Sequence, residues 1–555
     1  MTFLLILCSS RAFPFAVVSG TPQATQAAIE ILRVGGNAVD AMVAASFALN
    51  VTQPYNMGIG GGGFFLVAPP GPALDSSVSP VVLEHREQAP ASAHKAMFLG
   101  TDGKSIPSAE RMTGANPVGV PGTVAGLFEA HKKYGKLKWA RVLKPALELA
   151  RQGFPISSNF ELVLKDEWAR ISTFPETARV FGDGHGGPLK MGRLLKQPEL
   201  AQTLSEISQK GGSAFYEGAL AEKWLASAQG LGVKLVKEDL RAYRVRTKKS
   251  VEFEVFGHRF YTLDAPSGGS FLVAGALRFL EQYYRQHPVP AADSVERVVV
   301  SAEAIRYYQG LRDQKIADGV VGSFDFFWSA AEKSAWTEIT RRIDERIKSS
   351  AVAGVSRLSN GALEKTGHTA HLSVVDDHGM AVSYTTTIEQ HFGSGLVVPG
   401  FGFLLNNELS DFSADPENIN APAAGKRPRS NMSPLLVYKG KRLVGVLGCA
   451  GGSRIPTTLV QILENLFIYG MNAQAASAFP RIHPAIIASE GGREVLEVEA
   501  AFGEGMIGAL KKLSLEVTTV PIRTTAQVLF RGDGVRDAWQ AAAESRSEGM
   551  GVVIE

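Results

Sequence analysis

Hydroxyl side chains gather around residue 369, where two segments with the composition of β-strands follow one another. Thr369-Ala-His-Leu-Ser-Val-Val375 and Met380-Ala-Val-Ser-Tyr-Thr-Thr-Thr387 flank the turn-like Asp376-Asp-His-Gly379, which predicts a β-hairpin. If the first and last turn residues pair, Thr369 lies opposite Thr386, and a shift of one residue brings a neighbouring Thr opposite it instead. The hairpin therefore places a cluster of hydroxyls beside Thr369. On local evidence alone, residues that simply favour strands explain the same pattern.

Two glycines further along the chain could stabilise a developing negative charge. Gly451-Gly452-Ser453 follows a predicted strand at 443–447 and precedes a predicted helix that begins near Pro456 and ends at Gly470. Successive backbone N–H groups between a strand and a helix form a nest for an anion or oxyanion, although the same pattern is often only a turn. The glycine run at 58–63 lacks the Lys-Ser/Thr of a phosphate loop and precedes a strand, so a nucleotide site is not expected there.

Charged residues of opposite sign lie next to β-type segments. Arg86 follows one such segment, and Glu408 and Asp411 lie close together in another part of the chain. A guanidinium suits a carboxylate and two carboxylates suit an ammonium, so the three residues together could bind a zwitterion. Singly, each is more often a surface charge or a structural ion pair. The histidines show no metal-binding spacing, and two cysteines cannot form a disulfide framework or a cysteine-based zinc site.

The elements that must position these residues belong to a large globular chain. It has 555 residues, of which 45% are hydrophobic and 20% charged, enough for a sizeable core. The formal net charge of +3 gives no general reason to bind nucleic acid or anionic lipid. No apolar run reaches the roughly 18–20 residues of a membrane helix. Residues 1–14 are apolar and signal-like, but no basic residue precedes the apolar stretch, so a misplaced start codon explains them equally well.

Hydrophobic spacing divides the chain into four regions. Near the N-terminus, Thr21-Pro22 starts a helix that Gly35-Gly36 ends, and a second helix is expected at Ala38–Leu49. Strands are expected at 64–67 and 81–83, and a helix at 124–134. From about 160 to 350 the chain is predicted to be mostly helical and without chemistry. Residues 347–368 have the composition of a linker, and short strands follow to about 455.

Eight segments in order give the chain its resemblance to a known family. They are Gly35-Gly-Asn-Ala-Val-Asp-Ala41, Gly58-Ile-Gly-Gly-Gly-Gly-Phe64, Arg86-Glu-Gln-Ala-Pro90, Gly119-Val-Pro-Gly122, Thr369-Ala-His-Leu-Ser-Val-Val375, Asn406-Asn-Glu-Leu-Ser-Asp-Phe-Ser413, Met432-Ser-Pro434 and Gly451-Gly-Ser-Arg454. Together they resemble the gamma-glutamyltransferase family of N-terminal-nucleophile hydrolases. The resemblance implies an α+β fold, a four-layer αββα sandwich, made as one inactive chain that cuts itself into two subunits.

The resemblance also implies where the cut falls. Cleavage between His368 and Thr369 would leave a large subunit at 15–368 and a small subunit at 369–555. Thr369 would then begin the small subunit, where its hydroxyl is the nucleophile and its own α-amine the base. A linker before residue 369 agrees with this, because the new terminus must be able to move after the cut.

Further roles follow from the resemblance by position. Thr387 matches the hydroxyl that hydrogen-bonds the nucleophile, and Gly451 and Gly452 match the oxyanion donors. The substrate α-carboxylate would be held by Arg86 with Ser430 and Asn431, and its α-amine by Glu408 and Asp411. Two residues depart from the pattern: Asn431 replaces the second Ser of a common Ser-Ser pair, and Glu389 replaces an Asn near the substrate carboxylate, which an ionised Glu would repel unless paired.

The expected function is therefore that of a γ-glutamyltransferase and glutathione hydrolase. Its substrates would be glutathione and other γ-glutamyl compounds, with water, amino acids or peptides as acceptors and no cofactor or metal. The family favours a periplasmic or secreted location, and the weak signal leaves a cytoplasmic one open. Two alternatives are an acylase of the same fold, acting on glutaryl side chains of cephalosporins or on poly-γ-glutamate, and an uncleaved, non-catalytic binding scaffold. Glu408 and Asp411 favour a free α-amine, because a glutaryl group would leave both carboxylates unpaired.

Overall fold

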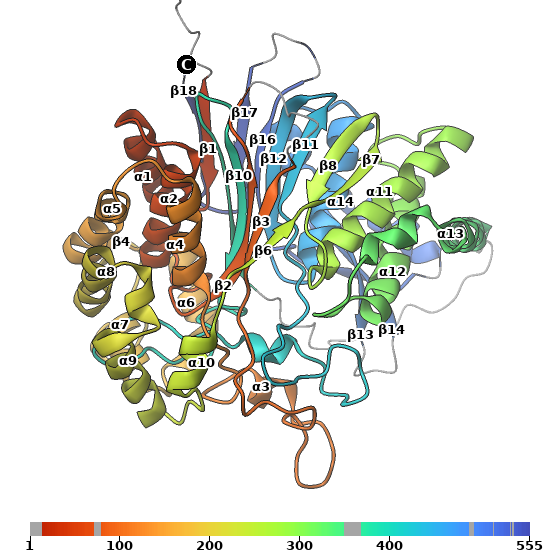
Figure 1. Cartoon of the computed structure of the whole chain (residues 1–555). Helices are drawn as coiled ribbons and strands as arrows, with labels where there is room; N and C mark the ends of the chain where they lie inside the picture. Colours follow the sequence, from red (N-terminus) through yellow and green to blue (C-terminus); the bar gives the residue numbers. More distant parts are fainter. Residues whose placement is uncertain are drawn as a thin grey trace, which may run out of the picture.

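Two β-sheets pack face to face between two layers of helices (Figure 1). The structure is a computed structural model that describes residues 14–71, 79–348, 368–487, 493–513, 515–532, 534 and 538–554. The signal-like segment, apart from Pro14, and the linker over 349–367 lie outside the described residues. Within the described chain, this arrangement is the four-layer αββα sandwich that the sequence predicts.

The first sheet has seven antiparallel strands and carries the predicted hairpin at its centre. In spatial order the strands are β18 (Met550–Ile554), β1 (Phe15–Ser19), β9 (Thr369–Val375), β10 (Ala381–Thr387), β2 (Gly62–Ala68), β3 (Val81–His85) and β6 (Arg246–Lys249). Because β9 is paired on both sides, by β1 and β10, the segment that begins with Thr369 is held firmly in the sheet.

The second sheet has six antiparallel strands. In spatial order they are β17 (Gln540–Ala543), β16 (Thr525–Phe530), β12 (Arg442–Ala450), β11 (Leu435–Lys439), β8 (His258–Thr262) and β7 (Val251–Val255). The central strands bury both faces. In β2, for example, Phe65 and Val67 face the core beneath the first helical layer, whereas Phe64 and Leu66 face the core shared with the second sheet. This two-sided burial explains why these strands are almost continuously apolar.

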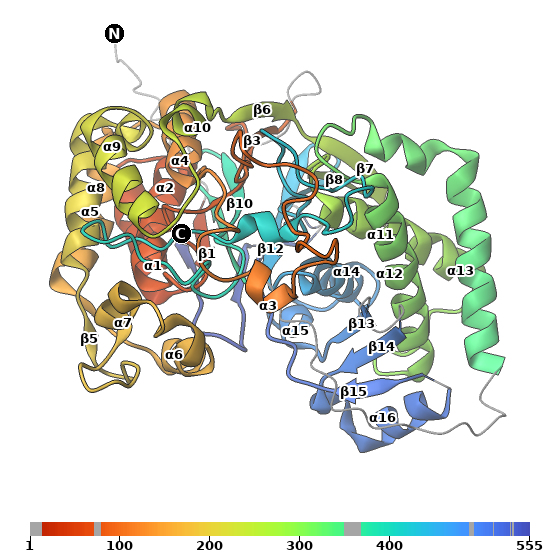
Figure 2. The same cartoon turned by 90° about the horizontal axis from the view of Figure 1, so that it is seen from below.

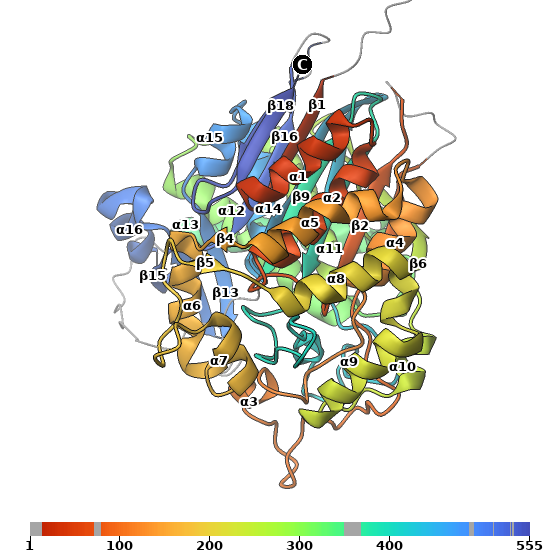
Figure 3. The same ribbon diagram turned by 90° about the vertical axis from the view of Figure 1, so that its left-hand side faces the viewer.

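Helices from the N-terminal half cover the first sheet (Figure 3). They are α1 (Pro22–Arg33), α2 (Ala38–Thr52), α4 (Thr123–Tyr134), α5 (Trp139–Gln152) and α8 (Pro198–Lys210), with α3 (Ser108–Arg111), α6 (Ser158–Ile171), α7 (Pro175–Phe181), α9 (Gly218–Gly230) and α10 (Lys237–Ala242) at the periphery. A short ribbon, β4 (Phe154–Pro155) with β5 (Leu194–Leu195), joins this layer. As predicted, Thr21 caps α1 and Pro22 opens it, and every residue of α2 is buried.

The second helical layer lies on the far side of the sandwich (Figure 2). It contains α11 (Gly268–Gln286), α12 (Val295–Lys315), α13 (Ala330–Lys348), α14 (Arg454–Phe467) and α15 (Ala473–Ala478). A small sheet of β13 (Ile482–Ile487), β14 (Arg493–Val498) and β15 (Val517–Thr519) lies beside it with α16 (Gly503–Lys512). None of the helices in the described part of the chain is long and apolar enough to cross a membrane.

Two details differ from the sequence prediction. The region 160–350 contains four strands, β5 to β8, and β6 and β7 belong to different sheets although only Ser250 separates them. The hairpin register is shifted by one residue, so that Thr369 pairs with Thr387 rather than Thr386. The cause is the turn: the Asp376 N–H donates to the Met380 carbonyl, and the loop closes with Gly379 at φ +79°, a conformation that glycine adopts without strain.

Candidate active site

A chain of hydroxyl contacts connects Thr369 to the peptide bond that precedes it. Thr369 begins β9, is 5% exposed, and lies opposite Thr387 at the end of β10. The Thr369 hydroxyl donates to Thr387 Oγ1 at 3.5 Å, and the Thr387 hydroxyl donates to the His368 carbonyl oxygen at 2.7 Å. The single Thr387 hydroxyl thus donates to the His368 carbonyl and accepts from Thr369. The contact predicted from the hairpin is present, in the shifted register.

The backbone of Glu389 contacts the same two residues, His368 and Thr387. Its carbonyl accepts from the His368 N–H at 2.5 Å, and its own N–H donates to Thr387 Oγ1 at 2.8 Å. Glu389 adopts φ +77° to make both contacts, in the left-handed region that costs a non-glycine residue of order 1–3 kcal/mol. Sequence reasoning assigned Glu389 a side-chain role only and missed this backbone role.

The glycine run before β2 allows this part of the sheet to close tightly around Thr387. A Cβ on Gly61 would lie 2.0 Å from the Thr387 carbonyl oxygen, and one on Gly62 would lie 2.5 Å from a carboxylate oxygen of Glu87. Glycine is therefore required by close backbone approach rather than by a phosphate ligand. These glycines bring the hairpin end and the residues after β3 into one site.

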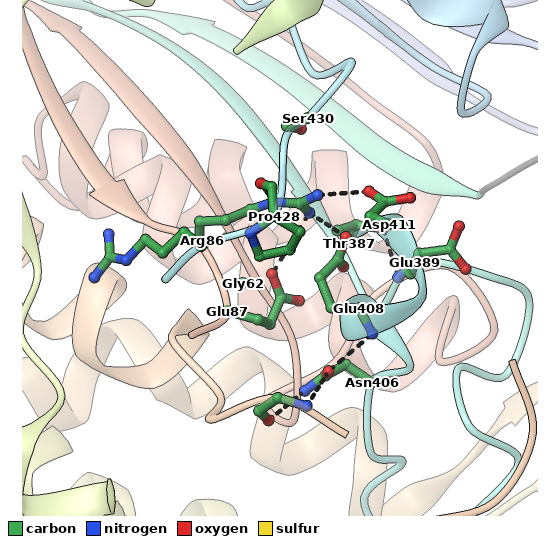
Figure 4. Close-up of polar contacts among 12 residues, drawn as sticks. Gly62, Arg86, Glu87, Thr387, Glu389, Asn406, Glu408, Asp411, Pro428 and Ser430 are labelled. Carbon is green, nitrogen blue, oxygen red and sulfur yellow. Dashed lines mark hydrogen bonds and ion pairs between the residues drawn. The ribbon is translucent and has the colours of Figure 1, made fainter. Parts of the chain in front are cut away.

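The predicted zwitterion-binding residues lie together and pair with one another (Figure 4). Arg86 follows β3 and its side chain is 1% exposed. Its two terminal nitrogens contact the carboxylates of Glu408 and Asp411, the latter at 2.6 Å. It also donates to the carbonyls of Pro428 at 3.3 Å and Arg429 at 3.1 Å. The Asp411 side chain, 32% exposed, is the most accessible member of the three.

Carboxyl groups outnumber the guanidinium in this cluster. Glu87, which sequence reasoning did not assign, lies 3.6 Å from Arg86 and is fully buried. Burial raises the pKa of Glu87 to about 7, and burial likewise raises the pKa of Glu408. The pKa of Glu389 is raised first by burial and then by the Asp411 charge. Only the tertiary fold reveals this excess of carboxyl groups around Arg86, because Glu87 is far in sequence from Glu389, Glu408 and Asp411.

These pKa directions change what Glu389 can do. A carboxyl whose pKa is raised keeps its proton toward neutral pH, and a protonated carboxyl donates a hydrogen bond instead of repelling an anion. The repulsion of a substrate carboxylate expected from the sequence therefore applies only above the raised pKa. For Arg86, burial disfavours the charged form, but the Glu408 and Asp411 carboxylates outweigh it and raise the pKa, so Arg86 stays charged.

The remaining predicted residues lie around this core. Ser430 is 2% exposed and directly follows the carbonyls that Arg86 contacts. The Asn431 side-chain oxygen instead accepts from Arg312 of α12 at 2.7 Å. Gly451, at φ +132°, and Gly452, at φ +59°, form the turn between β12 and α14. Gly451 lines the same cavity as Thr369, and α14 begins at Arg454, slightly earlier than predicted.

The His368 side chain packs against a second histidine. Its ring stacks on that of His391 with an interplanar angle of 7°. Burial lowers the pKa of His368 to about 3, so its ring is neutral at physiological pH. Within the described residues, no group of three or more His, Cys, Asp or Glu side chains could hold a metal ion. The chemistry available here is that of a hydroxyl nucleophile beside an ion-paired pocket.

Comparison with known proteins agrees with this geometry. A sequence model of gamma-glutamyltranspeptidases matches residues 24–554. The chain belongs to the gamma-glutamyltranspeptidase family. The glutathione hydrolase proenzyme of Escherichia coli is 33% identical, covering 94% of this chain and 89% of that protein. The glutathione hydrolase proenzyme of Pseudomonas aeruginosa is 32% identical, covering 99% and 97%.

Solved structures related to this gamma-glutamyltranspeptidase family member share its fold. The cephalosporin acylase of Bacillus halodurans superposes with a TM-score of 0.82 at 26% identity, covering 98% of this chain and 96% of that one. The gamma-glutamyltranspeptidase of Helicobacter pylori superposes with a TM-score of 0.53 at 31% identity, covering 58% of this chain and 90% of that one. The predicted family and the predicted fold are both confirmed.

Proposed function

We propose that the protein is a γ-glutamyltransferase and glutathione hydrolase that matures by cutting itself between His368 and Thr369. The observation that carries the proposal is the hydroxyl chain from Thr369 through Thr387 to the His368 carbonyl oxygen. It places a nucleophile and a proton donor on one peptide bond. The names of its relatives support the same reaction class.

Self-cleavage follows from these contacts in two steps. The Thr369 hydroxyl oxygen attacks the His368 carbonyl carbon, the carbon–nitrogen bond breaks, and the hydroxyl proton passes to the released Thr369 amine. Water then attacks the resulting ester, which frees the His368 carboxylate and restores the hydroxyl. Thr387 and the backbone of Glu389 hold the peptide for the first step. The products are a large subunit ending at His368 and a small subunit at 369–555 that begins with Thr369.

The mature enzyme would use the same hydroxyl on a γ-glutamyl amide. The Thr369 hydroxyl forms an ester with the γ-carbonyl, its α-amine takes the proton and then delivers it to the leaving amine. Backbone N–H groups of Gly451 and Gly452 would stabilise the tetrahedral oxyanion. Water or an amino acid or peptide amine then attacks the ester carbonyl and releases Thr369.

Substrate recognition would proceed by exchange of ion pairs in the Arg86 cluster. Without substrate, the guanidinium contacts the carboxyl groups of Glu408 and Asp411. An α-carboxylate that binds Arg86, assisted by Ser430 and Asn431, frees those carboxylates for the α-ammonium of the same ligand. A zwitterion therefore replaces internal pairs one for one, whereas a glutaryl group would leave the two carboxylates without a partner.

An acylase is the second candidate, because the likeness to a cephalosporin acylase extends over nearly the whole of both chains. The same Thr369 chemistry applies to both, and only the α-amine of the acyl group separates them. An uncleaved binding scaffold is a third reading. The clustered carboxyl groups around Arg86 favour the γ-glutamyl substrate, for the reason just given.

The experiment that tests the proposal combines maturation with substrate choice. Mass spectrometry of the purified protein should find a fragment that begins Thr369-Ala-His, and Thr369→Ala should remain one inactive chain. The mature protein should release nitroaniline faster from the γ-glutamyl anilide than from the glutaryl anilide. A full-length, inactive wild-type chain would support the scaffold, and a preference for the glutaryl compound would support the acylase.

Location and subunit composition belong to the same proposal. We expect a periplasmic or secreted enzyme, on the resemblance to the family, with the two subunits of one precursor staying together. Cell fractionation with activity measurement in each fraction tests the first expectation. Size-exclusion chromatography followed by a denaturing gel tests the second, because both fragments should elute in one peak.

A further inference from the structure

An arginine outside the Arg86 cluster determines how the Asn431 side chain is turned. Arg312, near the C-terminal end of α12, donates from its guanidinium to the Asn431 side-chain oxygen at 2.7 Å. A guanidinium carries only hydrogen-bond donors, so it can pair with the oxygen of an amide but not with its nitrogen. If the amide turned over, two donors would face each other. The contact therefore holds Asn431 with its oxygen toward Arg312 and its nitrogen away from it.

Arg312 is itself held in place from two sides. Its Nε donates to the Asp313 carboxylate at 2.9 Å, and its side chain is only 12% exposed. Its aliphatic part crosses the start of α11, where a Cβ on Gly268 would lie 2.6 Å from Arg312 Cγ. The same Asp313 carboxylate pairs with Arg429 at 2.9 Å, which connects α12 to the segment that carries Asn431. Arg312 is therefore a fixed donor rather than a mobile surface charge.

The backbone on both sides of Asn431 is fixed as well. The Gly268 N–H donates to the Ser430 carbonyl at 2.8 Å, and the Ser433 hydroxyl donates to the Asn431 carbonyl at 2.9 Å. The two residues before Ser430 present their carbonyls to Arg86. The Asn431 side chain is half-buried, and its amide nitrogen donates no hydrogen bond within the described residues. An unused donor is thus held on the segment that contacts Arg86.

We propose that Arg312 is a positioning residue that makes Asn431 a donor to the α-carboxylate of the acyl substrate. The inference rests on the proposed function, in which that carboxylate binds Arg86, and it adds the residue that decides which atom of Asn431 the carboxylate meets. With its oxygen turned toward the ligand, Asn431 would repel the carboxylate, because a carbonyl oxygen only accepts. A serine in this place would need no such partner, since its hydroxyl rotates to suit the ligand.

The test measures what the α-carboxylate contributes on the self-cleaved enzyme. The γ-glutamyl anilide is compared with the 4-aminobutyryl anilide, the same molecule without the α-carboxylate. In Arg312→Gln, whose amide also offers an acceptor, the Asn431 amide can turn over. The ratio of kcat/KM for the first substrate to that for the second should fall about tenfold, the loss of one charge-assisted hydrogen bond, and the loss should lie in KM. Arg312→Lys keeps a donor without an acceptor and should retain most of the ratio.

Two changes at Asn431 separate orientation from charge. In Asn431→Ser the hydroxyl turns by itself, so adding Arg312→Gln should leave the ratio unchanged. A loss as large as in the Asn431 enzyme would show that Arg312 acts through its own charge and would overturn the inference. Asn431→Asp keeps the shape and replaces the donor with a carboxylate oxygen, so the ratio should fall about 100-fold or more. If Arg312→Gln stays uncut, Asn431→Asp decides, and a wild-type ratio there overturns the inference.

Arg278→Gln is the matched control. The Arg278 side chain on α11 is 13% exposed and pairs with Glu332 of α13 at 2.7 Å, so the substitution removes an equally buried charge that does not contact Asn431. Its ratio should stay at the wild-type value. An unchanged ratio in Arg312→Gln, or an equal loss of kcat/KM for both substrates, would overturn the inference. A wild-type enzyme that cleaves neither the γ-glutamyl anilide nor glutathione would instead refute the proposed function.

Discussion

The Thr387 hydroxyl links Thr369, the proposed nucleophile, to the peptide bond that we propose is cut. Thr387→Val keeps the shape and removes the donor to the His368 carbonyl, so we expect self-cleavage to slow by about 100-fold or more, as when one oxyanion donor is removed. Thr387→Ser should retain most of the rate. The measurement is a time course of freshly made precursor on a denaturing gel. Normal maturation of the valine variant would exclude Thr387 from the cleavage step.

Glu389 combines a strained backbone with a buried carboxyl group. Asn adopts positive φ more readily than Glu, so Glu389→Asn should raise the free energy of unfolding by about 1 kcal/mol. The pKa of Glu389 is raised by burial and by Asp411, so this carboxyl group ionises only at higher pH. The KM of Glu389→Asn for γ-glutamyl substrates should therefore be close to that of wild type at neutral pH and lower than that of wild type at alkaline pH. Thermal unfolding and KM against pH check the two expectations. A less stable variant would show that the carboxyl group itself holds the loop.

At the scale of elements, the approach of β2 to β10 depends on the absence of side chains before β2. In Gly61→Ala, a Cβ would lie 2.0 Å from the Thr387 carbonyl oxygen, so we expect a loss of about 3 kcal/mol or more in the free energy of unfolding and defective maturation. Chemical denaturation measures the loss. Gly310→Ala in α12 is the control, since nothing lies within 4 Å of its Cβ position, and it should stabilise the protein by about 1 kcal/mol. Equal stability of the two variants would refute the packing argument.

The sequence predicts individual helices and strands better than it predicts how these elements pair with one another. Capping residues and glycines give α1 and α2 to within a few residues, and alternating hydroxyl and apolar residues give the β9–β10 hairpin. The observed register, Thr369 with Thr387, lies within the one-residue range that the sequence leaves open. The sequence does not select it, because the turn closes at Met380 through backbone hydrogen bonds that residue types do not specify. Strand β6 is not evident from the sequence, because Arg246-Thr-Lys-Lys249 is polar on an edge strand and is equally typical of a helix surface. Strand β7 does carry a strand signal, the alternation Val251-Glu-Phe-Glu-Val255, which the prediction of a mostly helical region passed over.

The candidate site shows the same limit. Arg86, Glu408 and Asp411 could be selected from their charges, and the fold brings them into contact. Glu87 and the backbone of Glu389 could not be selected from the sequence, because their roles arise only when β3, β10 and the loop at 408–411 meet.

At the scale of the whole molecule, two kinds of buried titratable group make the stability of the fold change with pH in opposite directions. Glu87 has its pKa raised from 4.5 to about 7, so the folded state keeps a proton that the unfolded chain loses. The stability from Glu87 is full below about pH 4.5 and is lost as pH rises toward 7. Burial lowers the pKa of His85 and of His371 from 6.5 to about 3, so the folded state loses stability as pH falls below 6.5.

Glu87→Gln separates the two contributions. Glutamine keeps the shape of the protonated carboxyl and cannot ionise, so the unfolding temperature of the variant relative to wild type should rise as pH increases from 5 to 8. Below about pH 4.5, where Glu87 is protonated in the folded and the unfolded state, stability should decline equally in both proteins, because the histidines are unchanged. Differential scanning calorimetry from about pH 4 to about pH 8 makes the comparison. Parallel curves for the two proteins would show that Glu87 titrates normally.

The strand order of the two sheets also determines whether the two fragments of the mature enzyme can separate. After the proposed cut, β9, β10 and β18 from the small subunit lie among β1, β2, β3 and β6 from the large one, and the second sheet mixes both subunits too. Separating the fragments would require removing β9 and β10 from the middle of the first sheet and breaking the pairing of β11 with β8 in the second. We therefore expect that the two fragments do not exchange between molecules. A cell that makes two variants of this protein should contain two separate populations without hybrid molecules. An inactive variant should therefore not lower the activity of an active one.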